Sequence, residues 1–126
     1  MNYLWVAMGS ALGGMGRYAF SGLGARYLGE TFPWGTLFVN VVGSLIIGVL
    51  AVVIPADSRV LADNSREFLM IGLCGGFTTF SSFSLETLNL ARNGAWGAAS
   101  AYTLGSIVLC LVAVAIGYFG ASALAR

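Results

Sequence analysis

Four long apolar segments run along this 126-residue chain, and they constrain its fold more than any other feature. They cover residues 3–27, 33–54, 68–90 and 95–124. Each is longer than the roughly 20 residues that an α-helix needs to cross a bilayer. Strands of a membrane barrel would be shorter and would alternate between apolar and polar residues. The sequence therefore predicts an all-α membrane protein, a single domain of four transmembrane helices over residues 1–126.

The composition points the same way. The chain is 58% hydrophobic and 9% charged, with a mean hydropathy of +0.86, whereas a soluble domain has about 25% charged residues. Lipid is therefore the expected neighbour of most of the surface. The net charge is +1 and no basic run is present, so nucleic acid is not an expected partner. Histidine is absent, and no catalytic motif is found, so the sequence does not predict an enzyme.

The connections are short and their charges are nearly balanced. Pro55 should end the second helix, and the loop at 56–67 is the only charge-rich stretch. Arginines outside the helices divide three against two between the two sides of the membrane, if the helices alternate in direction. Because an excess of arginine fixes orientation, we expect the chain to insert both ways and to pair as an antiparallel dimer.

The third segment is the most informative. Gly75 and Gly76 are followed by five hydroxyl side chains within seven residues, at positions 78, 79, 81, 82 and 84. This composition makes a poor continuous helix, so we predict a break at 75–79. Free carbonyls at such a break suit a cation and free N–H groups suit an anion. An ion or water path is therefore expected here.

Other polar residues lie inside the apolar segments, where they are costly unless paired or functional. Arg17 is either a helix-end anchor or a positive vestibule for anions. Asn40 either bonds a neighbouring helix or lines a path. Glu86 lies one turn after Ser82 and follows Phe80 and Phe83, whose rings either pack or present positive edges to an anion. Tyr102, Ser106 and Cys110 recur every four residues and form one polar stripe.

Three motifs resemble the signature blocks of the Fluc/CrcB family of fluoride channels. They are GMGRY at 14–18, GTLFVNVVG at 35–43 and GGFTTFSSFS at 75–84. Their order, the chain length and the number of apolar segments also match, so the resemblance covers the whole chain.

The resemblance implies a passive fluoride channel in the bacterial inner membrane, an antiparallel dual-topology homodimer with two pores. The third helix would break at the dimer centre, where backbone carbonyls of Gly75 and Thr78 from both copies would bind a structural sodium ion. Arg17 would lie at the vestibule. The expected fluoride path comprises Asn40, Phe80, Phe83, Ser81, Ser82, Ser84, Tyr102, Ser106 and Glu86. Cys110 stands where some family members continue this polar track with a hydroxyl.

Two other functions fit parts of the sequence. A small dual-topology multidrug exporter would share the length and charge balance, but it would need an acidic residue in the first helix, and residues 3–27 contain none. A non-transporting membrane assembly subunit would explain the small residues that allow close helix packing. It would not explain the hydroxyl run after the glycines.

Overall fold

The computed structural model describes residues 2–54 and 62–125, and within these ranges the chain is built from helices. Its elements are α1 (Asn2–Leu28), α2 (Trp34–Val53), α3 (Ala62–Ser65), η1 (Arg66–Cys74), α4 (Gly75–Phe77), α5 (Ser81–Arg92) and α6 (Trp96–Leu124). The all-helical fold class is confirmed. The prediction that Pro55 ends the second helix lies outside the described residues, as does the first half of the predicted loop at 56–67. The second half of that loop, residues 62–67, is helical in α3 and at the start of η1, so the loop prediction is wrong there.

Three helical stretches are long and apolar enough to cross a membrane: Trp34–Val53, Arg66–Arg92 and Trp96–Leu124. The chain is thus a multi-pass membrane protein. The helix α1 has 27 residues but is not among the three, because glycines and polar residues interrupt its apolar sequence.

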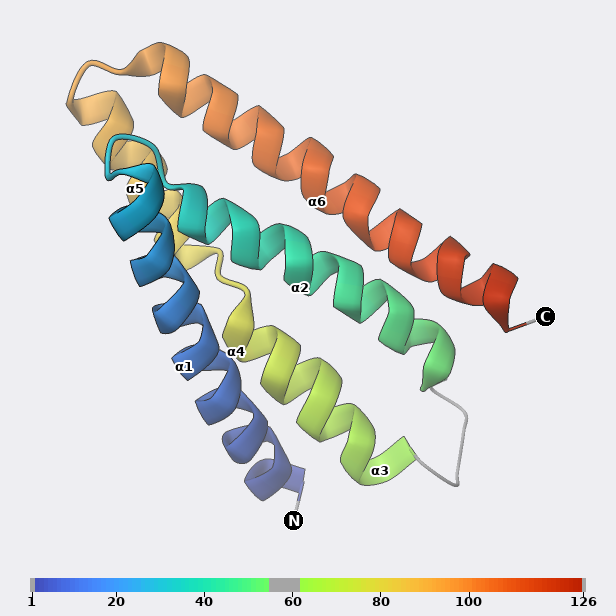
Figure 1. Ribbon diagram of the computed structural model, residues 1–126. Coiled ribbons are helices and arrows are strands. Elements are labelled where there is room, and N and C mark those ends of the chain that lie inside the picture. Colours follow the sequence, from blue (N-terminus) through green and yellow to red (C-terminus); the bar gives the residue numbers. More distant parts are fainter. Residues whose placement is uncertain (1, 55–61, 126) are drawn as a thin grey trace.

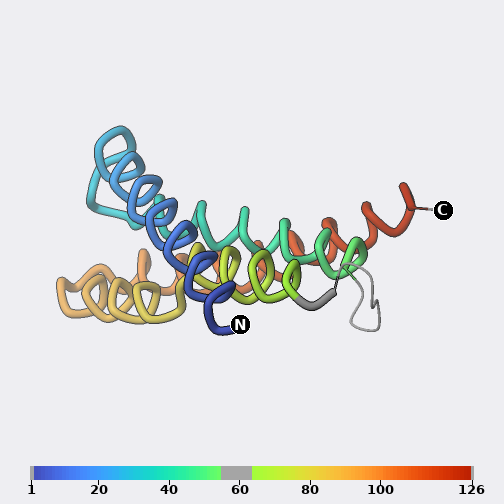
Figure 2. Tube along the Cα trace, turned by 90° about the horizontal axis from the view of Figure 1, so that it is seen from below, coloured from blue at the N-terminus to red at the C-terminus, as the bar shows by residue number. Residues whose placement is uncertain are grey.

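The helices form an open bundle rather than a closed one. Figure 1 shows α2 and α6 running side by side along their length, while α1 crosses η1 and α4. In Figure 2, η1 and α5 follow one another as two parts of a single rod, and α1 leans away from it. The turns that join the long helices use glycine: Gly29 has φ +90° and Gly94 has φ +82°, values that favour glycine after a helix end.

Glycines also set how closely the helices approach. At the crossing of α1 with η1 and α4, a Cβ on Gly72 would lie 2.9 Å from the Cα of Gly9, and one on Gly76 would lie 2.9 Å from the Cα of Ser10. Real Cβ atoms do not approach a backbone this closely, so neither glycine can carry a side chain without a shift. The same holds between α2 and α6. A Cβ on Gly48 of α2 or on Gly117 of α6 would lie too close to the backbone of the other helix.

The break in the third segment lies later than predicted. The helix continues through Gly75 and Gly76 to Phe77, and the interruption occupies residues 78–80, with Thr78 extended at φ −82° and ψ 159°. The prediction of 75–79 overlaps it only at the two threonines. Gly76 stays helical because its bare backbone packs on α1, so tertiary contact outweighs the low helix propensity of glycine.

Candidate functional site

The break is held by a side chain from another helix. Asn40 of α2 accepts a hydrogen bond from the N–H of Thr79 at 2.8 Å and donates one to the carbonyl of Thr79 at 3.0 Å. Both main-chain groups of this non-helical residue are therefore satisfied by one carboxamide. A carboxamide is the side chain with an acceptor and donors in the same plane, which suits it to replace a peptide partner.

Other contacts complete the ends of the interruption. The hydroxyl of Thr79, the residue before the N-cap Phe80, accepts the N–H of Ser82 at 3.2 Å and so satisfies one free N–H in the first turn of α5. Before the break, Thr78 donates its hydroxyl to the carbonyl of Cys74 at 3.0 Å. The Nε of Arg17 donates to the carbonyl of Gly76 at 3.1 Å. The residues around the break are thus held from α1, from α2 and from within the segment itself.

Some carbonyls at the break remain free. Those of Gly75, Phe77 and Thr78 accept no hydrogen bond from any residue that the structure describes. Gly75 and Thr78 also line the cavity beside the break. The carbonyls of Gly75 and Thr78, which the family resemblance implies for a cation site, are thus two of these three free carbonyls.

This break cavity has a volume of about 330 Å³. Its polar and thiol side chains come from α2, the end of η1, the break and α6. They are Asn40, Ser44, Cys74, Thr78, Thr79, Ser106 and Cys110. The rings of Phe80 and Phe83 complete the wall. Ser106 is 6% exposed, and its hydroxyl has no hydrogen-bond partner among the described residues. A buried hydroxyl without a partner indicates a place where a ligand or water would sit.

A second space, the turn cavity, has a volume of about 680 Å³. It lies between the α1–α2 turn and the end of α5, and its lining includes Phe32, Thr36, Glu86, Asn89 and Asn93. Asparagine, threonine and glutamate side chains give it a polar wall at one end of the bundle.

A hydrogen-bonded group separates the two cavities. Glu86 accepts from the hydroxyl of Thr36 at 3.0 Å and from that of Tyr102 at 3.3 Å, so its carboxylate joins α5 to α2 and α6. Tyr102 is fully buried.

Beside this group runs a row of aromatic rings. The centroid distances are 5.4 Å from Phe80 to Phe83, 5.1 Å from Phe83 to Tyr102 and 5.4 Å from Tyr102 to Phe32. The row starts in the break cavity and ends in the turn cavity.

The predicted path residues therefore divide into two sets. Asn40, Phe80, Phe83 and Ser106 meet in the break cavity, and Tyr102 and Glu86 follow them. The serines of α5 lie elsewhere: Ser81 and Ser84 are exposed, Ser84 bonds the carbonyl of Phe80, and Ser82 lines neither cavity. Their place in the path stays a prediction.

Two threonines were not among the predicted site residues. Thr36 is 5% exposed and binds Glu86, and Thr79 is the residue held by Asn40. A signal for Thr36 was present, because it lies one turn before Asn40 on the same helix face.

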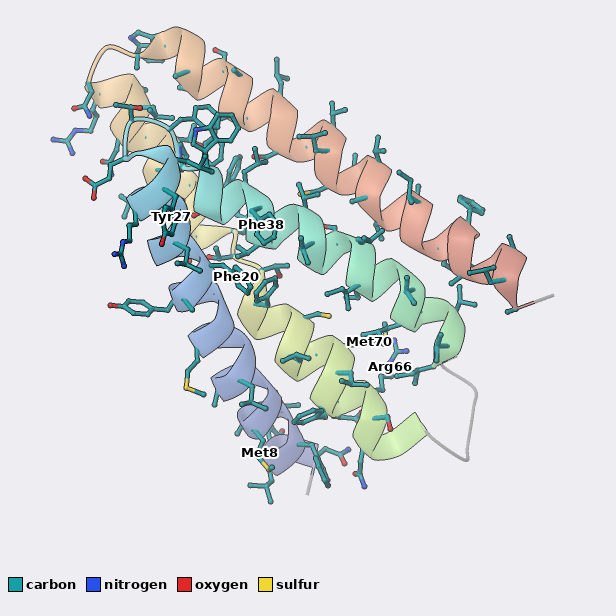
Figure 3. All side chains as sticks on the ribbon, in the orientation of Figure 1. Met8, Phe20, Tyr27, Phe38, Arg66 and Met70 are labelled. Carbon is teal, nitrogen blue, oxygen red and sulfur yellow. The ribbon has the colours of Figure 1, made fainter. Side chains whose placement is uncertain are left out.

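Two further aromatic contacts place the break next to α1. Phe20 of α1 lies 5.5 Å from Phe38 of α2 and 6.0 Å edge-on from Phe77, between ring centroids. Figure 3 shows Phe20 and Phe38 as neighbours between α1 and α2. Phe77 therefore packs against α1.

Comparison with known proteins decides the family. The family model described as CrcB-like protein, Camphor Resistance (CrcB), matches residues 4–118. The chain belongs to the CrcB-like family. A relative from Opitutus terrae named "Fluoride-specific ion channel FluC" is 58% identical over 120 residues, covering 94% of this chain and 91% of the relative. A second protein of that name, from Rhodospirillum rubrum, is 50% identical over 122 residues, covering 96% and 95%.

Further CrcB-like relatives are matched along their whole length. The protein of the same name from Paramagnetospirillum magneticum is 49% identical over 127 residues, which covers 100% of this chain and 99% of the relative. The resemblance that the three motifs predicted is confirmed.

Proposed function

We propose that this chain is a fluoride-selective ion channel and not an enzyme, and that it exports fluoride passively from the cytoplasm. The relatives that it matches along nearly all of its length are named as fluoride-specific channels. The observation that carries the proposal is the course of polar and aromatic groups from the break cavity, past Tyr102 and Glu86, to the turn cavity.

The chemistry of this course suits a small anion. Fluoride holds its water strongly, so a narrow path must replace that water with donors. The hydroxyl of Ser106 and the second amide N–H of Asn40 are neutral donors, and the edges of Phe80 and Phe83 carry positive potential. The hydroxyl of Tyr102 donates to Glu86. Several weak sites in succession allow an ion to enter and leave, whereas one strong site would retain it.

The protomer alone is an incomplete site, and we propose that a second copy in antiparallel orientation completes it. Phe80 is 78% exposed although it lies at the break in the middle of the chain, and Gly75 beside it is exposed as well. A copy inserted in the opposite direction would cover both breaks at once and give two pores. The nearly balanced arginines allow both directions of insertion.

The same arrangement would create a cation site. The free carbonyls of Gly75 and Thr78 would face those of the partner copy, and main-chain oxygens of interrupted membrane helices bind sodium ions. The donor set therefore fits a structural sodium ion at the dimer centre. We also propose that α1 crosses the bacterial inner membrane as a fourth spanning helix, which places Arg17 near the path.

Fluoride efflux from liposomes tests the channel. Vesicles containing the purified protein are loaded with fluoride or chloride salts, a potassium ionophore removes the voltage, and ion-selective electrodes record release. We expect rapid release of fluoride and none of chloride. If a folded dimer releases no fluoride, the proposal is wrong, and proton-coupled export of a cationic drug becomes the next assay.

Reporters attached to the C-terminus test the dual topology separately. Reporters active on only one side of the membrane should give signals from both sides in cells. Signal from a single side would contradict the antiparallel dimer but would leave the fluoride measurement unaffected.

A further inference from the structure

A second role for Arg17 rests on a hydrogen bond from its side chain to the main chain of another helix. Arg17 is half-buried on α1, and the atom in contact is Nε, which donates to the carbonyl of Gly76 at 3.1 Å. The two residues are 59 positions apart in sequence. Gly76 is the second residue before the break, so this hydrogen bond joins α1 directly to the end of α4.

The carbonyl of Gly76 would otherwise have lost its partner. In a continuous helix it would accept the N–H of Phe80, four residues on. The chain turns at Thr78 instead, and Phe80 is the N-cap residue before α5. A main-chain carbonyl without a partner is costly inside a membrane. The Nε of Arg17 supplies the missing donor.

The backbone geometry explains why the side chain reaches this carbonyl. Gly76 lies directly on α1: a Cβ there would be 2.9 Å from the Cα of Ser10 and 3.2 Å from the N of Gly14. With no side chain on Gly76 between the two backbones, an arginine one turn further along α1 meets the carbonyl. Gly14 and Gly76 belong to the motifs at 14–18 and 75–84, so the contact joins two separate sequence blocks.

We propose that Arg17 is a positioning residue for the break. It holds the carbonyl of Gly76 on the α1 side, while Asn40 holds both main-chain groups of Thr79 on the α2 side. Between these two anchors lie the extended Thr78 and the free carbonyls of the break cavity. The relevant property of Arg17 is its Nε–H donor, in addition to any attraction that its charge exerts on anions.

Three substitutions separate the donor from the charge. Arg17→Gln places an amide N–H the same number of bonds from Cα as the arginine Nε and removes the charge. Arg17→Lys keeps the charge and puts a methylene at that position. Arg17→Met has comparable length and neither property. Arg26→Met is the matched control, because Arg26 is an exposed arginine of the same helix.

Fluoride efflux of these variants gives the first readout, and it rests on the proposed function. The efflux rate of Arg17→Gln divided by that of Arg17→Met measures the contribution of the donor. The efflux rate of Arg17→Lys divided by that of Arg17→Met measures the contribution of the charge. We expect the first ratio to be about ten-fold and the second to be close to one, with Arg26→Met unchanged. The proposal would be overturned if Arg17→Lys carried fluoride as fast as Arg17→Gln, or faster.

Amide hydrogen exchange across residues 78–84 gives the second readout, and it needs no transport. Exchange should be faster than wild type in Arg17→Met and Arg17→Lys but not in Arg17→Gln. Equal exchange in all three would overturn the positioning role. If the wild type carries no fluoride, the proposed function fails, and the exchange measurement still decides the role of Arg17.

Discussion

Two regions of the molecule satisfy their main-chain polar groups in different ways. One is the pair α2 and α6, and the other is the interrupted segment from η1 to α5. A membrane requires every main-chain polar group to find a partner. The helices α2 and α6 meet this requirement within themselves and pack side by side (Figure 1). The third segment stops being helical at 78–80. Side chains of other helices bind the carbonyl of Gly76 and both main-chain groups of Thr79, and three carbonyls beside them stay free.

This difference separates stability from function along the chain. The close approach of Gly48 and Gly117 to the opposing backbones serves the packing of α2 on α6. The hydrogen bonds of Asn40 serve the shape of one short segment beside a cavity. Damage to the first region should therefore unfold the protein, whereas damage to the second should stop conduction first.

The largest effect is expected from Asn40→Ala. It removes the partners of the N–H and the carbonyl of Thr79 together, and each unpaired buried group costs about 1–3 kcal/mol. We expect fluoride efflux from liposomes to fall by about 100-fold or more. Asn64→Ala, the same change at an exposed position of α3, is the control and should conduct normally. Wild-type efflux from Asn40→Ala would show that the break keeps its shape without the two hydrogen bonds of Asn40.

The second largest effect is expected on the stability of the packing between α2 and α6. A Cβ at Gly117 would meet the carbonyl oxygen of Leu45 and lie 3.2 Å from the N of Val49. Gly117→Ala should lower the free energy of unfolding by about 1–3 kcal/mol, because two backbones must move apart. Unfolding in mixed micelles measures this change.

Gly120→Ala is the control for that change. It lies on the same helix, three residues further on, and a Cβ there would meet no described atom within 4 Å apart from the adjacent backbone of α6 itself. Equal stability of the two alanine variants would mean that the contact between α2 and α6 is looser than in this structure.

A smaller and more selective effect is expected from Ser106→Ala. The hydroxyl is buried and has no partner in the described part of the chain, so its removal should change the free energy of unfolding by less than about 0.5 kcal/mol. Fluoride efflux should nevertheless fall by about ten-fold, because the path loses a donor.

Ser100→Ala, an exposed position on the same helix, should leave both quantities unchanged. A loss of stability equal to the loss of efflux would assign Ser106 to packing instead of the path.

The smallest effect is expected at the start of α5. Thr79→Val keeps the side-chain shape and removes the hydroxyl that accepts the N–H of Ser82, which should cost about 1 kcal/mol of unfolding free energy. Thr79→Ser keeps the hydroxyl and should cost less. A loss of stability in serine but not in valine would show that the methyl group, and not the hydroxyl, matters at this position.

The sequence by itself determined the helical class, the membrane environment and the family. Long apolar runs, few charges and three motifs in order carry this information locally, because helix length and hydropathy depend on neighbouring residues. It also indicated an interruption in the third segment, since hydroxyls and paired glycines disfavour helix.

Only the tertiary structure decided where that interruption lies and which side chains hold it. Glycine propensity predicted a break beginning at Gly75, but contact of Gly76 with α1 keeps the helix intact to Phe77. The pairing of Asn40 with Thr79 joins residues 39 positions apart, and that of Arg17 with Gly76 joins residues 59 apart. Such partners are set by how the helices cross, and the helix-crossing geometry is a property of all the packed backbones together.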